Sequence, residues 1–482
     1  MLTLLLILLP IAAAVLTLAT GARVAKQVAL IGGLAELGLA VFAWSQFDPS
    51  AGSQFGFKYQ WLASAGISFA AGIDGISMIL VLLTAFLTPF IILSAFGHQY
   101  KNSATFYSLI LFMEAALIGV FTATDAFLFY LFFEAALIPV YFLAAVWGGE
   151  NRAKVTFKFF IYTMFGSLFM LVALVFLYYK TPGTHTSELT AFYNLQLSAQ
   201  SQGFIFWAFF IAFAIKMPLF PFHTWQPDTY TESPTQATML LSGIMLKMGV
   251  YGLIRLLLPI VPLGVETWGL LAVILSVIGI IYGSIIAIQQ RDMKRLIAYS
   301  SFAHVGLMSA GVFSSSEHGL QGAMIQMLAH GINVVGMFYI VDLIYTRTKT
   351  RYLDQLGGIS QNSPKFSIYF MILLLGSVAL PLTNGFVGEF LLLSGVFNYN
   401  AWLGAIAGVT IILGSVYMLR LYQKSMFGPK SNWVEGFKDL TLTESAVLIP
   451  LVIMVFWIRI YPNTFLKISE PAVNQILLII TK

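Results

Sequence analysis

The chain has no cysteine among its 482 residues and unusually few charged residues. Without cysteine it can form no disulfide and offers no thiolate ligand to zinc or to an iron–sulfur cluster. Charged residues make up 9% of the sequence, against about 25% in an average soluble domain. So few charges cannot cover a soluble surface of this size, which excludes a water-soluble enzyme, a disordered protein and a nucleic-acid-binding protein. Because 59% of the residues are hydrophobic, the composition predicts a polytopic membrane protein.

The apolar residues are grouped into long runs. A helix needs about 20 apolar residues to cross a bilayer, and 14 runs approach or exceed that length. No Lys or Arg precedes the first run, which indicates an uncleaved membrane helix rather than a signal peptide. The runs predict an all-α fold with transmembrane helices at about 1–20, 27–46, 72–96, 104–123, 125–147, 154–179, 202–224, 235–258, 267–288, 294–313, 318–344, 366–395, 400–426 and 442–464.

Basic residues are distributed unevenly between the two ends of such a bundle. Of the 25 Lys and Arg residues, 17 fall in alternate loops on one side. Cytoplasmic loops are the ones enriched in Lys and Arg. The bias therefore predicts a multi-pass protein of the cell inner membrane with both termini on the outer, periplasmic side.

Two of the runs are interrupted by proline. The breaks lie near 216–221 and 379–385, about five helices apart, and each is followed by a run with a similar ending. A repeat with an odd number of spans must be inverted in the membrane, and ion transporters use inverted repeats with broken helices to build midplane sites. We predict N-terminal helices 1 to 3 in 1–103, a first five-helix repeat in 104–258, a second in 267–426, and a last transmembrane helix with a short tail in 442–482.

Several titratable residues fall inside the runs. A charge at the bilayer centre costs about 2.5–3.5 kcal/mol on insertion scales, so such residues need partners, water or a function. Proton conduction requires groups that exist both charged and neutral, and buried Lys and Glu meet this because burial disfavours their charged forms. A Lys216–Glu134 pair would be switchable, and Pro218 would free carbonyls beside it. The candidate relay residues are Glu134, Lys216, Lys247 and Glu389, with His223, His304, His330 and Glu114 as secondary members.

Each of these residues also has a structural explanation. A single Glu–Lys pair can serve only to fix helix packing, and a histidine in a membrane often bridges two helices. The same structural explanation stays open for Glu114 and for Glu36. Asp125, at the start of a run, is expected to cap a helix, whereas Asp342, near the end of a run, is expected to pair with a loop cation.

Together, eight segments of this sequence resemble the antiporter-like, proton-pumping subunits of respiratory complex I. Any one of them alone would be weak, but the combination covers roughly residues 70–430 and is highly specific. The segments are FEAALIP at 133–139, KMP at 216–218, HTWQPD at 223–228, SPT at 233–235, LKMGVYG at 246–252, YSS at 299–301, HVG at 304–306 and FVGEF at 386–390.

Glu389 makes the subunit M branch of this family, which includes the mitochondrial subunit-four type, the most similar. The related L and N branches are expected to carry lysine at that position. The resemblance implies that Glu134 and Lys216 form a first channel pair, that Lys247 and the histidines form a central hydrated relay, and that Glu389 is the terminal carboxylate. One departure is Thr229-Tyr230, where the family often has Ala-His.

The implied function is that of a proton-translocating membrane-arm subunit of NADH:quinone oxidoreductase. Such a chain would be a translocase subunit driven by quinone reduction elsewhere, with no cofactor, metal or redox centre of its own. Its expected partners are neighbouring antiporter-like subunits, membrane lipid and protons, and no nucleic acid. Three alternatives stay open: a D-type subunit of a multisubunit Na+/H+ antiporter, a structural membrane scaffold, and a self-contained secondary transporter.

Overall fold

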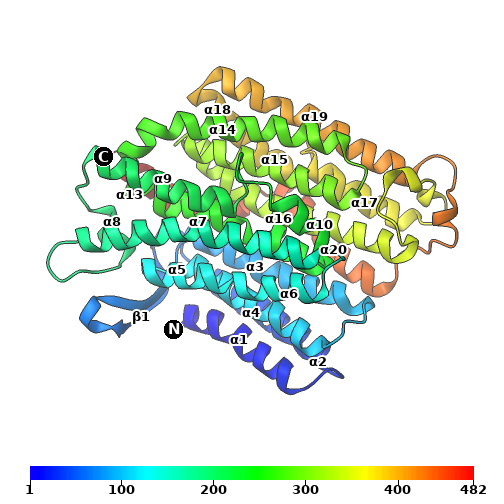
Figure 1. Cartoon of the computed structure of the whole chain (residues 1–482), viewed down its shortest axis with the longest axis horizontal. Helices are drawn as coiled ribbons and strands as arrows, with labels where there is room; N and C mark the ends of the chain where they lie inside the picture. Colours follow the sequence, from blue (N-terminus) through cyan, green and yellow to red (C-terminus); the bar gives the residue numbers. More distant parts are fainter. Residues whose placement is uncertain (482) are drawn as a thin grey trace.

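The computed structural model describes residues 1–481 and consists almost entirely of long helices that run alongside one another (Figure 1). Thirteen helices in this part of the chain are long and apolar enough to cross a membrane. A further crossing is made by two shorter helices in line, α17 and α18, so the prediction of about 14 spans is confirmed. The single-helix spans are α1 (Leu2–Ala19), α2 (Ala25–Ser45), α3 (Gly75–Ser94), α4 (Ser103–Thr122), α7 (Arg152–Lys180), α9 (Ala199–Lys216), α14 (Pro262–Gln289), α15 (Met293–Phe313), α16 (Glu317–Thr348), α19 (Ala401–Met426) and α20 (Leu442–Ile460).

Two other spans are continuous but divided into segments. The fifth span consists of α5 (Ala126–Ala135) and α6 (Leu137–Trp147). The eighth alternates α-helical segments with two π-helical turns, in which hydrogen bonds run from residue i to i+5. Its segments are α11 (Thr235–Leu240), the π turn η3 (Leu241–Met245), α12 (Lys247–Gly252), the π turn η4 (Leu253–Leu257) and α13 (Leu258–Ile260).

The two predicted helix breaks are present. After α9 ends at Lys216, the chain passes through a non-helical segment before the short α10 (Gln226–Glu232). Likewise α17 (Pro364–Ser377) ends before the second break, and α18 (Asn384–Tyr399) follows it. Figure 1 places α9 and α18 toward the end of the bundle that holds both termini, and α10 and α17 toward the other end. The two interrupted spans therefore run in opposite directions, as inverted repeats require.

The connection between α2 and α3, which the apolar runs leave without a predicted helix, is mainly β-structure. This connection forms an antiparallel hairpin of β1 (Gln54–Leu62) and β2 (Ile67–Ile73). Its first strand carries aromatic residues at every second position, namely Phe55, Phe57, Tyr59 and Trp61, which is the two-residue period of a strand. This segment is too short and too polar to have been predicted as a membrane span.

The predicted short tail forms a helix, α21 (Asn463–Ile480). One face of α21 buries apolar residues, while the opposite face is exposed. The Ser469 hydroxyl donates to the Gln321 side chain at 2.9 Å, and the Ile468 carbonyl lies directly against Gly75. The chain end is therefore fixed across the starts of α3 and α16.

Burial differs between the centre of the bundle and its rim. The apolar window of α16 is entirely buried, and those of α15 and of the α11–α13 span are almost entirely so. In contrast α1, α2, α7 and α19 expose many large apolar side chains, as lipid-facing helices do. Three of the eight candidate relay residues, Lys247, His304 and His330, lie on these central helices.

Candidate functional site

The first π turn positions Lys247. A π turn leaves a carbonyl without its usual partner within the helix. The Lys247 ammonium, which is fully buried, donates to the Ser242 carbonyl in η3 at 2.6 Å. Gly249, two residues after Lys247, packs so closely against Met217 that no Cβ would fit there. This close approach keeps α12 against the break that follows α9 and keeps lipid away from Lys247.

The Lys247 ammonium also contacts His330 on α16. Its Nζ lies 3.0 Å from His330 Nδ1. A charged ammonium has only donors, so Nδ1 accepts this bond and the ring hydrogen lies on Nε2. His330 Nε2 is buried without a partner among the described residues. Lys247 and His330 thus form a direct contact along which a proton can pass.

A small cavity lies beside His330. Its volume, about 20 Å³, exceeds the 10–15 Å³ or so that one water needs. Its polar lining includes His304, Ser300 and Asn333, and His330 Nε2, Gln326 Oε1, Asn333 Oδ1 and Ser301 Oγ have no partner among residues 1–481. Buried polar atoms are usually satisfied by protein or by ordered water. The cavity therefore has the size and the lining to bind a water molecule.

His304 and Glu389 lie on the other side of this cavity. The His304 and His330 ring centroids are 5.6 Å apart. His304 Nδ1 lies 2.8 Å from the Ser300 carbonyl, and its Nε2 lies 3.1 Å from both the Ser377 carbonyl and Glu389 Oε1. All of these partners are acceptors, so the geometry favours the imidazolium, with a hydrogen on each nitrogen, beside the Glu389 carboxylate.

The second helix break makes this arrangement possible. Because α17 stops at Ser377, its last carbonyls lose their helical partners, and one of them accepts from His304. The chain resumes at α18, whose second turn places Glu389 beside the same imidazole. Four of the predicted residues are thus brought together in one buried row, in the order Lys247, His330, His304 and Glu389.

The predicted pair of Glu134 and Lys216 is close but not in direct contact. Lys216, at the end of α9, is buried with its ammonium 4.5 Å from the ring centroid of Phe133, the residue before Glu134. A cation over an aromatic face is stabilised by the ring quadrupole. No ion pair joins Lys216 to Glu134 within residues 1–481, and Glu134 is half-buried near the end of α5.

Two further predicted residues stay outside the row. His223 lies in the first break and stacks on Phe302 with ring centroids 4.4 Å apart, and its Nδ1 has no partner in the described chain. Glu114 on α4 is fully buried and, like Glu36 on α2, makes no hydrogen bond through either carboxyl oxygen to any described residue. The structure connects neither His223 nor Glu114 to the row, so their roles remain predictions.

Sequence reasoning missed part of this site. Gln326 and Asn333 line the cavity beside His330, and the Asn333 amide donates to Asn384 at 3.0 Å. Gln326, His330 and Asn333 follow one another at four and three residues, which places them on one face of α16. A polar stripe with helical spacing inside an apolar run was the signal that would have found them.

The two carboxylates expected to have structural roles have them. Asp125 caps α5 by accepting from the Phe127 and Leu128 amides at 2.9 and 3.1 Å, and burial raises its pKa. Asp342 lies 2.7 Å from His98 Nε2 in the loop after α3, and this hydrogen bond raises the pKa of His98 although burial opposes it. The cap predicted at Asp125 is confirmed, whereas Asp342 pairs with a loop histidine. These residues hold the ends of the bundle rather than its polar centre.

No group of three or more His, Cys, Asp or Glu side chains within residues 1–481 is arranged to hold a metal ion. The polar centre of this bundle contains Lys, His and Glu side chains and the cavity between them. Groups of this kind bind and release protons.

Known proteins show the same sequence features. A family model described as NADH:quinone oxidoreductase/Mrp antiporter, TM matches residues 123–414, and one described as NADH-ubiquinone oxidoreductase chain 4, amino terminus matches residues 45–120. The chain is 41% identical over 458 residues to NADH-quinone oxidoreductase subunit M of Rickettsia typhi (strain ATCC VR-144 / Wilmington), with 94% of this chain and 92% of that protein covered. The chain belongs to the subunit M family of NADH-quinone oxidoreductases.

Other members of the subunit M family and solved structures agree. NADH-ubiquinone oxidoreductase chain 4 of Arabidopsis thaliana is 36% identical over 94% of this chain and 92% of its own. A chain of respiratory complex I from Thermus thermophilus with bound NADH matches with a TM-score of 0.93 at 30% identity over the full length of both chains. A chain of the Mrp complex from Dietzia sp. DQ12-45-1b matches with a TM-score of 0.85 at 19% identity over 100% of this chain and 99% of that one, a likeness of fold alone.

Membership in the subunit M family confirms the resemblance that the sequence motifs indicated. The departure at Thr229-Tyr230 is also accommodated. Tyr230 is fully buried, and its ring packs edge-on against Phe338 at 6.0 Å. Its hydroxyl makes no hydrogen bond with any described residue.

Proposed function

We propose that this chain is a proton-translocating membrane-arm subunit of an NADH:quinone oxidoreductase, driven by quinone reduction in other subunits. The observation that carries the proposal is the buried row of Lys247, His330, His304 and Glu389, which crosses the centre of the bundle from one repeat to the other. Membership in the subunit M family supports the same function.

The row supplies each element that proton transfer needs. Lys247 holds a proton as an ammonium 3.0 Å from His330 Nδ1. When Nδ1 accepts that proton, the hydrogen on Nε2 can pass to a water in the adjoining cavity and from there toward His304. His304, which is charged at rest, can take up this proton once it has given its own Nε2 proton to the Glu389 carboxylate, 3.1 Å away. Each transfer is reversible, so the energy that sets its direction must come from outside this row.

Glu134 and Lys216 would regulate entry to the row. The Lys216 ammonium contacts the ring of Phe133, so a small movement at the junction of α5 and α6 changes its distance from the Glu134 carboxylate. A nearby carboxylate favours the charged lysine, and its withdrawal favours release of the proton. Redox-driven motion in neighbouring subunits would act on the row by changing the distance between Lys216 and Glu134.

The orientation follows from the loops. The basic loops lie at the end of the bundle away from the termini, and we infer that this end faces the cytoplasm. Both termini, the hairpin and α21 would then face the periplasm across the cell inner membrane. Neighbouring membrane-arm subunits and lipid would cover the exposed apolar rim.

The proposal is tested by Glu134→Gln and Lys216→Ala in the assembled complex. Both variants should assemble and should abolish or sharply reduce proton pumping, measured as NADH-driven acidification of reconstituted vesicles. The matched controls are Glu188→Gln and Lys58→Ala, which break an ion pair of the same residue types between the hairpin and the connection after α7. Normal pumping by both test variants would refute the proposal.

A second experiment distinguishes the respiratory function from cation exchange. The chain is tagged and gently solubilised, and its co-purifying proteins are identified by mass spectrometry. We expect quinone-module and iron–sulfur subunits. A set of small antiporter subunits without redox centres would instead assign the same residues to sodium/proton exchange.

A further inference from the structure

A line of polar side chains leads from Lys247 toward the end of the bundle that holds the termini. Lys247, Tyr251 and Arg255 follow one another at intervals of four residues, which places them on one face of the α12 span. At about 1.5 Å per residue, Arg255 lies about 12 Å beyond Lys247 along the helix axis. Without a barrier, protons on Lys247 could move along this face to the terminal end of the bundle instead of to His330.

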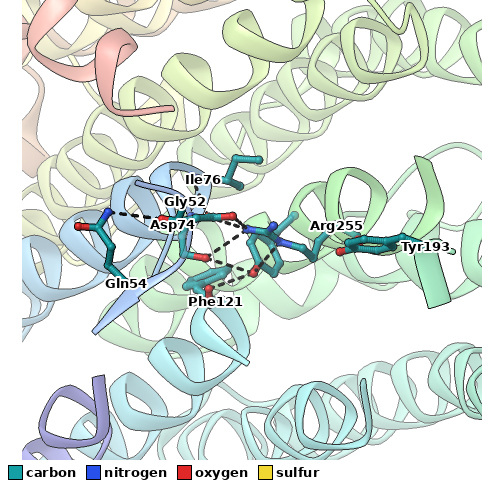
Figure 2. Close-up of polar contacts among 9 residues, drawn as sticks. Gly52, Gln54, Asp74, Ile76, Phe121, Tyr193 and Arg255 are labelled. Atoms are coloured by element: carbon teal, nitrogen blue, oxygen red, sulfur yellow. Dashed lines mark hydrogen bonds and ion pairs between the residues drawn. The ribbon is translucent and has the colours of Figure 1, made fainter. Parts of the chain in front are cut away.

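Arg255 closes the line with an ion pair. Its Nη2 donates to both oxygens of Asp74 at 2.6 Å, and Asp74 also accepts from the Ile76 and Ser77 amides as the N-cap of α3. The Arg255 and Asp74 side chains are only 13% and 16% exposed. Figure 2 shows Arg255 pointing at Asp74 between Phe121 and Tyr193.

The neighbouring groups hold this pair rigidly. Arg255 Nε donates to the Tyr251 hydroxyl at 3.3 Å, and that hydroxyl donates to the Phe121 carbonyl at the end of α4 at 3.0 Å. The π turn η4 leaves a carbonyl free at Arg255, and the Tyr193 hydroxyl donates to it at 2.8 Å. The cluster therefore joins α3, α4, the α12 span and the loop helix α8 (Leu189–Tyr193).

A guanidinium in this position is a barrier to protons. Arginine remains charged at all ordinary pH values and so cannot take part in a relay by giving up its proton. Its fixed positive charge also repels an excess proton, and arginine side chains exclude protons and cations from other membrane pores in this way. Both oxygens of Asp74 are already occupied by Arg255.

We infer that Asp74, Tyr251 and Arg255 form an outer seal that blocks proton movement between Lys247 and the terminal side of the bundle. The inference rests on the proposed function, because it assumes that Lys247 carries protons. The seal leaves His330 as the acceptor for those protons and so prevents them from leaking through the first repeat to the terminal side of the bundle. Arg255 is a positioning residue in this scheme and takes up no proton itself.

The test is the passive proton leak of the whole complex in vesicles, without NADH or quinone. A pH difference is imposed by a jump of the external pH, with potassium and valinomycin present to cancel the membrane potential, and its decay is followed with an internal pH dye. We expect Arg255→Met to speed the decay roughly tenfold, the effect of removing a unit charge about 12 Å from Lys247 at an effective dielectric constant of about 20. Asp74→Asn should increase the leak less, because asparagine keeps the helix cap while the ion pair is lost.

Arg347→Met is the matched control. Arg347 pairs with Glu444 at 2.7 Å, with side chains 14% and 18% exposed, in the last turn of α16 and the first turn of α20 at the other end of the bundle. Its loss should destabilise the protein comparably and leave the leak unchanged. The inference is overturned if assembled Arg255→Met and Asp74→Asn leak no faster than wild type. If Arg255→Met does not assemble, Asp74→Asn alone decides.

The leak and the relay fail in different ways. Loss of the seal raises proton flow without turnover, whereas loss of the proposed relay lowers NADH-driven pumping and leaves the passive leak normal. A complex that never pumps but leaks faster with Asp74→Asn would refute the proposed function and retain the barrier.

Discussion

Replacing Glu389 by glutamine removes the negative charge at the end of the buried row. Glutamine has nearly the same shape, so the local packing at α18 stays intact. Glu389 Oε1 lies 3.1 Å from His304 Nε2, and both side chains are buried. The change therefore acts mainly on the electrostatic stabilisation of a proton at His304.

The magnitude follows from Coulomb's law. Unit charges about 4 Å apart interact by about 4 kcal/mol at an effective dielectric constant of about 20. Each 1.4 kcal/mol or so is a factor of ten in an equilibrium constant. Without the carboxylate, the charged form of His304 should become roughly a thousandfold less populated, and proton flux through it should fall accordingly.

The assay is the initial rate of vesicle acidification divided by the rate of NADH oxidation in the reconstituted complex. Glu444→Gln serves as the control, because it removes the carboxylate of a mostly buried pair with Arg347 outside the row. Glu389→Asp, which keeps the charge but shortens the side chain, should retain part of the flux. If Glu389→Gln pumps as wild type does in an assembled complex, the electrostatic role assigned to Glu389 is incorrect.

Two further predictions concern the ends of the bundle. Asp342 raises the pKa of His98 above its usual value of about 6.5, so the pair stabilises the fold below that pH and loses this effect as the pH rises through the folded-state pKa. The melting temperatures of wild type and His98→Gln should therefore differ at pH 6 and converge at alkaline pH. An equal difference at both pH values would contradict the assignment. Asp125→Ala removes the cap of α5 and should lower the free energy of unfolding by about 0.5–2 kcal/mol, measured as a lower melting temperature. Asp125→Asn should keep most of the wild-type melting temperature. An unchanged melting temperature in Asp125→Ala would show that the cap contributes nothing.

Local sequence patterns predicted the features that depend on nearby residues. Apolar runs located the spans because a lipid-facing helix must be apolar over its whole length. Pro218 and Pro381 marked the two breaks because proline cannot supply the hydrogen bond a helix interior needs. Asp125 was recognised as a cap because its side chain acts on amides two and three residues away.

Features that depend on distant residues were beyond sequence patterns. Lys247 meets His330 across 83 positions of the chain, a contact that requires the two repeats to be packed together. The Lys216 ammonium lies over the ring of Phe133, the residue before Glu134, a contact that no local pattern indicates. Arg255, in the π turn η4, pairs with Asp74 across 181 positions of the chain.

The central claim is that protons pass through Lys247, which joins the first repeat to the histidines of the second. Its most direct test is the number of protons translocated per NADH oxidised by the reconstituted complex carrying Lys247→Met. Methionine keeps an unbranched, buried side chain but has no proton to transfer to His330. The account predicts that proton translocation is lost while the complex remains assembled. An assembled Lys247→Met complex with the wild-type ratio would contradict it.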